Sequence, residues 1–145
     1  MKAPRVVAAT RFIPAPPDDI FNLLADPREH SRFDGSGTLQ EVQSAPVRLS
    51  KGATFTMGMK IGRRYHTKNT VVVFEENRAI AWHHFAQFVW RYDLVPSDGG
   101  TMVSESFDYS KPWGRLIERF GWPARNLTSI EATLRRIEEI VTSPS

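Results

Sequence analysis

The chain has 145 residues, of which 41% are hydrophobic and 24% charged, and its net charge is +3. This length suits one domain with its own core. The absence of cysteine excludes disulfides and thiolate metal sites. No apolar run approaches the ~18 residues of a membrane span, and Met1–Ala9 is too short and polar for a signal peptide. We therefore expect one cytoplasmic domain over 1–145, with a disordered tail at 142–145.

Basic residues are scattered along the chain, apart from Arg63-Arg64 with Lys60 and Lys68 nearby. A dedicated nucleic-acid binder concentrates its positive charge on one face. We therefore expect no nucleic-acid partner.

The first 37 residues predict one strand followed by helix. Pro17 suits the first turn of a helix, and Asp18 and Asp19 favour its positive end. Asp26-Pro27 ends this helix because a residue before proline avoids helical geometry. The expected elements are a strand Arg5–Ile13, a helix from Pro17 to Asp26, one further turn within Arg28–Phe33, and a loop Asp34–Gly37.

From Thr38 onward the hydrophobic period switches to two, which indicates strands. Phe55, Met57 and Met59 alternate with polar residues, and Gly62-Arg63-Arg64 reads as a turn. The expected strands are Thr38–Val47, Ala53–Ile61, Tyr65–Glu75, Ala79–Phe85, Phe88–Val95 and Thr101–Tyr109.

Pro96–Gly100 gives the strongest hairpin signal in the chain. A four-residue loop, Ser97–Gly100, would place Tyr92 opposite Glu105 and Trp90 opposite Phe107. Directly opposed residues share one face of a sheet. This face is therefore apolar apart from one carboxyl group, while Arg91 and Asp93 point to solvent.

The last third of the chain predicts a long helix. Its apolar residues recur in steps of three and four, which places them on one stripe. A proline inside a helix costs roughly 3 kcal/mol, so a break or kink is expected at Gly121-Trp122-Pro123. The stripe comprises Leu127, Ile130, Leu134, Ile137 and Val141, and an earlier stripe comprises Trp113, Leu116, Ile117 and Phe120.

These elements predict an α+β fold: a curved antiparallel sheet of about seven strands wraps around a long C-terminal helix. One or two short helices follow the first strand. Several segments resemble the START/birch-allergen superfamily (SRPBCC), and especially short bacterial proteins of the polyketide cyclase/dehydrase type. The segments are Ala15–Phe21, Ala25-Asp26-Pro27, Phe33-Asp34-Gly35, Ile80-Ala81-Trp82, Trp90–Pro96 and Gly99–Glu105.

The resemblance covers nearly the whole chain and implies a helix-grip fold with a deep apolar cavity and no obligatory cofactor. Fold does not fix function, because the superfamily includes lipid carriers, receptors, cyclases and chaperone activators. Aromatic-forming cyclases of the family line the cavity with Arg, Tyr and Trp. No such arginine maps here, since Arg63 and Arg64 lie at a predicted turn and Arg91 points outward.

Glu105 is the first candidate for a functional side chain. An ionised carboxylate on an apolar face must be paired, hydrogen-bonded or protonated. It would bind the polar end of a ligand or act as an acid/base with Tyr92 as a donor; the alternative is a carboxyl group that reaches a cavity water or the rim.

His83-His84 invites a metal hypothesis, but neighbours on a strand point to opposite faces. Zinc needs three or four convergent ligands, so we expect no metal. His84 shares the face of Trp82, where it is either a polar cavity residue or an ordinary packed histidine. Gly35-Ser36-Gly37 does not follow a strand and open a helix, as a phosphate loop must, and is interpreted as a loop at the cavity mouth.

Three functions follow from these observations. The first is carriage or sensing of a lipid, polyketide or isoprenoid-like molecule by a monomer or homodimer. The second is a cyclase, aromatase or dehydratase in which Glu105, Tyr92 and His84 move protons. The third is a protein-interaction module of the chaperone-activator type. The predicted ligand-binding residues are Phe33, Phe55, Met57, Met59, Trp82, His84, Trp90, Tyr92, Glu105, Phe107, Leu127, Ile130 and Leu134.

Overall fold

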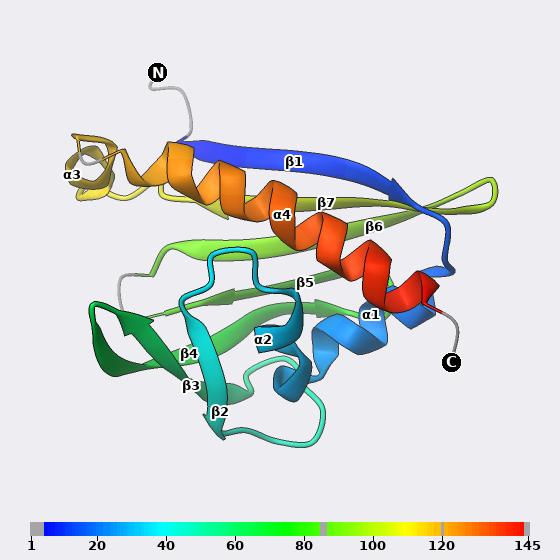
Figure 1. The fold of residues 1–145 in the computed structure, drawn as a ribbon, viewed down its shortest axis with the longest axis horizontal. Helices are drawn as coiled ribbons and strands as arrows, with labels where there is room; N and C mark the ends of the chain where they lie inside the picture. Colours follow the sequence, from blue (N-terminus) through cyan, green and yellow to red (C-terminus); the bar gives the residue numbers. More distant parts are fainter. Residues whose placement is uncertain (1–4, 85–86, 120, 144–145) are drawn as a thin grey trace.

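A computed structural model describes residues 5–84, 87–119 and 121–143. It forms one open antiparallel sheet with the strand order β1-β7-β6-β5-β4-β3-β2, and helices on one face (Figure 1). The predicted α+β helix-grip fold is confirmed. The strands are β1 (Val6–Ile13), β2 (Leu39–Ser44), β3 (Thr54–Ile61), β4 (Arg63–Glu75), β5 (Ala79–His83), β6 (Val89–Ser97) and β7 (Gly100–Asp108).

Short helices follow β1, as the sequence predicts. Pro17 occupies the start of α1 (Pro17–Ala25), and Asp18 and Asp19 lie in its first turn. Ile20, Phe21 and Leu24 are fully buried, so α1 packs its apolar face on the sheet. A 3₁₀ turn, η1 (Pro27–Glu29), leads into the single helical turn α2 (His30–Phe33).

The long helix α4 (Trp122–Thr142) runs diagonally across the sheet, mainly against β1 and β7 (Figure 1). Its inner stripe is buried at Ile130, Leu134 and Ile137, while Leu127 and Val141 are half-buried. The break before Pro123 is confirmed. Gly121 takes the left-handed backbone conformation, with φ of 74°, and Pro123 lies in the first turn of α4, where no backbone donor is lost.

The β6–β7 hairpin has the predicted register: Tyr92 pairs with Glu105 and Trp90 with Phe107. The predicted loop was too long, because Ser97 pairs with Gly100 and leaves only Asp98 and Gly99 in the turn. Gly99 has a φ of 81°, which suits a tight two-residue turn. The register survives the error because pairing Ser97 with Gly100 only extends the same ladder.

Other boundaries also differ from the sequence predictions, and the ones that bear on the site are these. Arg63 and Arg64 belong to β4 rather than to a turn, because Ile61 pairs with Arg63 around Gly62 alone. β5 ends at His83, so His84 is not on a strand, and Phe85 lies outside the described residues. The helix α4 continues through Thr142, the first residue of the predicted tail.

The predicted apolar stripe before Gly121 is wrong at Trp113 and Leu116, and its last residue, Phe120, lies outside the described residues. The short helix α3 (Gly114–Arg119) begins after Trp113, and Trp113 and Leu116 are 44% and 57% exposed. A helix of six residues presents too little surface to bury a full apolar stripe.

Candidate functional site

A cluster of aromatic side chains fills the space between α2 and the inner face of the sheet. Its centre is His30, whose ring stacks on Trp82 at 4.9 Å with an angle of 19° between the planes. Phe33 and Phe55 lie 5.3 and 5.4 Å from the same imidazole. Tyr92 joins through Trp82, at 5.7 Å. We call these five residues the His30 cluster.

His30 is 2% exposed, and its Nε2 atom lies 2.8 Å from the backbone oxygen of Leu24. Burial lowers the pKa of His30 to about 4, and the bond to Leu24 opposes the shift only in part. The imidazole is therefore neutral near pH 7, and Nε2 must carry the proton because the carbonyl of Leu24 can only accept. The sequence analysis did not identify His30.

Tyr92, a member of this cluster on β6, lies opposite Glu105 on β7. Their exposed fractions are 3% and 4%. Oε1 of Glu105 is buried and has no hydrogen-bond partner among the described residues. Burial raises the pKa of Glu105 well above its usual range, and a hydrogen bond with the Tyr92 hydroxyl opposes this only in part. Burial, and secondarily the nearby Glu105, also raise the pKa of Tyr92.

Asp34 adds negative charge near this pair and further raises the pKa of Glu105. It lies at the C-terminal end of α2, in the loop predicted at the cavity mouth, where its carboxyl oxygens accept hydrogen bonds from Ser36 and from the backbone N–H of Leu39. The site thus contains one carboxyl group with its polar partners and one, on Glu105, without a full set.

The loop after α2 is fastened to α4. The Gly35 N–H donates to Thr133 Oγ1 at 2.8 Å, and Arg136 donates to the carbonyl of Asp34. A Cβ atom on Gly35 would lie 2.3 Å from the backbone oxygen of Ser129. Only glycine allows this close approach of loop and helix.

Two polar side chains of β4, missed in the sequence analysis, share this inner face. Thr67 pairs with Met57 and Asn69 with Phe55, and Thr67 and Asn69 are 8% and 7% exposed. The Asn69 amide donates to the carbonyls of Phe55 and Thr67. Opposed residues share a face, so extension of the β3 alternation across the Gly62 turn into β4 would have identified both.

The predicted ligand-binding residues fall into several groups. Phe33, Phe55, Trp82 and Tyr92 belong to the His30 cluster, and Glu105 lies beside it. Trp90 and Phe107 form a second group with Phe88, Tyr109 and Trp113, in which neighbouring ring centres are 4.5 to 6.3 Å apart. We call this the Phe88 cluster. Met57, Ile130 and Leu134 are buried, whereas Met59 and Leu127 are half-buried.

His84 lies beside the Phe88 cluster, with its ring 6.2 Å from that of Phe88. Burial, and secondarily the neighbouring His83, lower the pKa of His84. His84 therefore contacts the Phe88 cluster, whereas Tyr92 belongs to the His30 cluster and lies opposite Glu105. Within the described residues, no group of three or more His, Asp or Glu side chains is placed to hold a metal ion.

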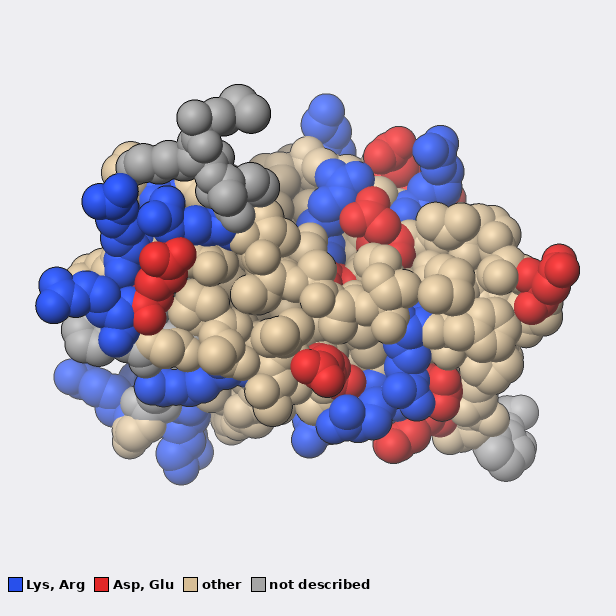
Figure 2. All heavy atoms as spheres, turned by 90° about the horizontal axis from the view of Figure 1, so that it is seen from above, with Lys and Arg blue, Asp and Glu red and all other residues tan. Residues whose placement is uncertain are grey.

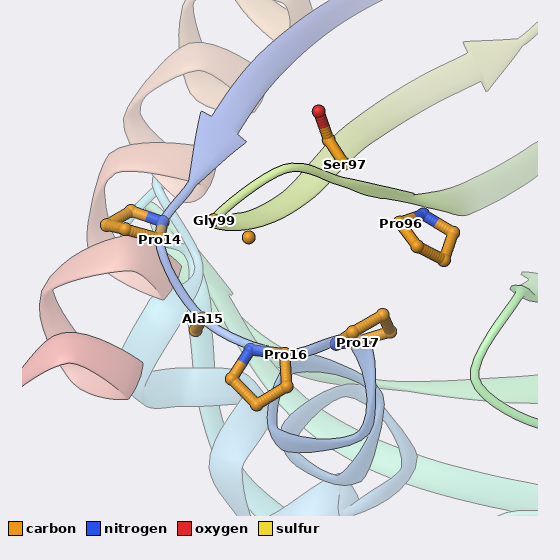
Figure 3. Close-up of a pocket in the computed structure, with 8 residues that line it drawn as sticks. Pro14, Ala15, Pro16, Pro17, Pro96, Ser97 and Gly99 are labelled. Carbon is orange, nitrogen blue, oxygen red and sulfur yellow. The ribbon is translucent and has the colours of Figure 1, made fainter.

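A shallow surface groove of about 400 Å³ lies where the segment after β1 passes the tip of the β6–β7 hairpin (Figure 3). None of its lining residues is ionisable, so the groove offers no acid–base chemistry. It is lined by Pro14, Ala15, Pro16, Pro17, Pro96, Ser97, Gly99 and Gly100.

Comparison with known proteins identifies the family of this chain. A family model described as polyketide cyclase / dehydrase and lipid transport matches residues 4–142. The chain belongs to this family. An uncharacterised protein of Mycobacterium tuberculosis, Rv0088, is 32% identical over 143 residues, or 94% of this chain. The chain spans only 64% of the length of that relative.

Solved structures share the fold of this chain at low sequence identity. A crystal structure from Rhodobacter sphaeroides has a TM-score of 0.74 at 16% identity and covers 97% of this chain and 93% of its own. Protein Ms6760 of Mycobacterium smegmatis has a TM-score of 0.74 at 17% identity, with 94% and 90% covered. No helix in the described part of the chain is long and apolar enough to cross a membrane.

Proposed function

We propose that the protein binds a hydrophobic small molecule, such as a lipid, a polyketide or an isoprenoid, between the sheet and α4. The observation that carries the proposal is the buried carboxyl group of Glu105, whose Oε1 has no partner among the described residues. A buried polar atom without a hydrogen bond costs stability. A ligand with a hydroxyl or carbonyl group would provide the missing bond.

The surroundings of Glu105 support an apolar ligand rather than an ion. Aromatic rings of the His30 cluster supply large, flat apolar surfaces, and Met57 adds a side chain that adapts to irregular shapes. Because burial raises the pKa of Glu105, the carboxyl group keeps its proton to higher pH than an exposed glutamate does. It then both donates and accepts hydrogen bonds.

Native mass spectrometry of freshly purified protein is the direct test. A co-purifying small molecule is the expected result, and its mass gives its chemical class. Titration with an apolar fluorescent probe should saturate, and Glu105→Gln should change the affinity less than tenfold because the shape of the interior is kept. Glu131→Gln, on the exposed side of α4, is the matched control. Absence of both a co-purifying molecule and saturable probe binding would contradict the proposal.

A second function, a cyclase, aromatase or dehydratase, is supported by the same pair. A protonated carboxylic acid beside a tyrosine hydroxyl can deliver a proton to a bound carbonyl or leaving hydroxyl group. Removal of such a group lowers turnover by roughly 10²–10⁴, whereas removal of a group used only for binding weakens affinity alone. Turnover of a polyketide-type substrate by the wild type but not by Glu105→Gln would favour this function over carriage.

A further inference from the structure

One end of the molecule gathers exposed basic side chains from segments far apart in the sequence. The β3–β4 hairpin and α3 lie at the same end of the fold (Figure 1), and Figure 2 shows Lys and Arg crowded there. Glu118 lies at this end but is paired with Arg5 at 2.8 Å. We call this surface the basic end and define it by Lys60, Arg63, Arg64, Arg115 and Arg119, which are all exposed and make no ion pair with any described residue.

Large apolar side chains are exposed within the same surface. Leu116 is 57% exposed, between Arg115 and Arg119 on α3, and Trp113, just before α3, is 44% exposed. The Trp113 ring lies 6.3 Å from the buried ring of Phe88, so the exposed tryptophan continues the Phe88 cluster to the surface. Tryptophan with an apolar residue and flanking cations is typical of a surface that enters the headgroup region of a bilayer.

We propose that the basic end docks on an anionic membrane surface. Lys and Arg side chains would lie among the acidic headgroups, and Trp113 and Leu116 would enter the boundary between headgroups and acyl chains. The inference does not depend on an interior ligand. We favour a membrane over nucleic acid because an exposed leucine gains nothing from a phosphate backbone, whereas burial in a bilayer interface removes it from water.

Vesicle co-sedimentation of the full chain tests the proposal. Binding to phosphatidylcholine vesicles should be weak, and inclusion of phosphatidylserine should strengthen it. Added salt should weaken it again, because screening reduces attraction between exposed charges. Equal binding to both vesicle types, or binding to neither, would overturn the proposal.

Two pairs of neutral substitutions locate the surface. Each basic side chain near an anionic leaflet strengthens binding about fivefold, so Arg63→Gln/Arg64→Gln and Arg115→Gln/Arg119→Gln should each weaken binding about 25-fold. Lys51→Gln/Arg78→Gln removes the same charge from exposed positions beyond the opposite ends of β3 and β4. A loss in this control pair as large as in the two test pairs would overturn the proposal in favour of a net-charge effect.

Tryptophan fluorescence provides a second measurement, which a purely electrostatic attraction to the vesicle would leave unchanged. The tryptophan emission of the wild type should shift to shorter wavelength on phosphatidylserine vesicles, and Trp113→Phe should lose most of that shift. Saturable binding of single-stranded RNA without vesicle binding would assign the surface to nucleic acid and overturn the proposal. If a variant fails to fold, judged by circular dichroism, the lipid and salt dependence of the wild type still decides.

Discussion

Two buried polar side chains of the interior, His30 and Glu105, differ in how far their hydrogen bonds are satisfied. His30 has its hydrogen-bond acceptor at 2.8 Å and aromatic rings around it. Glu105 has Tyr92 beside it, but one of its oxygens is left without a partner in the described part of the chain. A satisfied buried group stabilises a fold, whereas an unsatisfied one costs roughly 1–3 kcal/mol. The first is therefore structural, and the second supports our assignment of a ligand contact.

The largest loss of folding stability should come from removal of His30, the side chain whose hydrogen bond is satisfied. His30→Ala deletes the ring that stacks on Trp82 and leaves the carbonyl of Leu24 unpaired, so the free energy of unfolding should fall by about 3–4 kcal/mol. His66→Ala removes an exposed histidine of β4 and should change it by less than about 0.5 kcal/mol. Urea denaturation near pH 7 measures both, and equal losses would contradict a structural role specific to His30.

Acid should remove the stability that the neutral His30 side chain contributes, without any mutation. The pKa of His30 is lowered from 6.5 to about 4 in the folded state, so the unfolded chain binds the proton first as pH falls. Stability present above pH 6.5 should therefore be lost as pH falls toward 4, by at most roughly 3 kcal/mol. Urea denaturation across this range should show a steeper loss for wild type than for His30→Gln, and parallel curves would contradict the assignment.

For Glu105, the change of folding stability with pH should have the opposite sign. Burial raises its pKa in the folded state, so its contribution is fully present below the ordinary value of 4.5 and is lost as pH rises toward the raised value. Glu105→Gln cannot titrate, and in alkaline solution it should be more stable than wild type by roughly 2 kcal/mol. Denaturation at several pH values measures this difference, and Glu131→Gln on α4 should show none.

The smallest effect should come from the hydroxyl of Tyr92. Tyr92→Phe removes the hydrogen bond to Glu105 and should lower the free energy of unfolding by about 1 kcal/mol. In the Glu105→Gln background the same change should cost a different amount, because the two residues share one interaction. A double-mutant cycle measures this coupling, and strict additivity would show that the pair does not interact.

The hairpin that holds Tyr92 and Glu105 could be predicted from sequence because alternation and a strong turn signal constrain it together. An error of two residues in loop length left the register intact, and with it the opposition of the two side chains. The strands and the break before α4 were predictable for similar local reasons: Gly and Pro punctuate the chain, and the hydrophobic period changes between them.

His30 could not be predicted in this way. It lies in a single helical turn, too short for a hydrophobic period to be read, and its ring partners on the sheet come from β3 and β5. His84 was assigned to the inner face because a strand was expected to continue past His83, but β5 ends there. Side chains positioned by contacts between distant elements leave little trace in local periodicity.

The pairing of β1 with β7 has a consequence for the order of folding. Val6 pairs with Asp108, and α4 then packs along the same edge strand. A strand made at the start of synthesis must therefore wait for residues made about 100 positions later before its hydrogen bonds are formed. Contacts so distant in sequence slow folding because a long loop must close before any contact is gained. On the ribosome, the β2–β6 part of the sheet should form first, and β1 should join only when β7 has emerged.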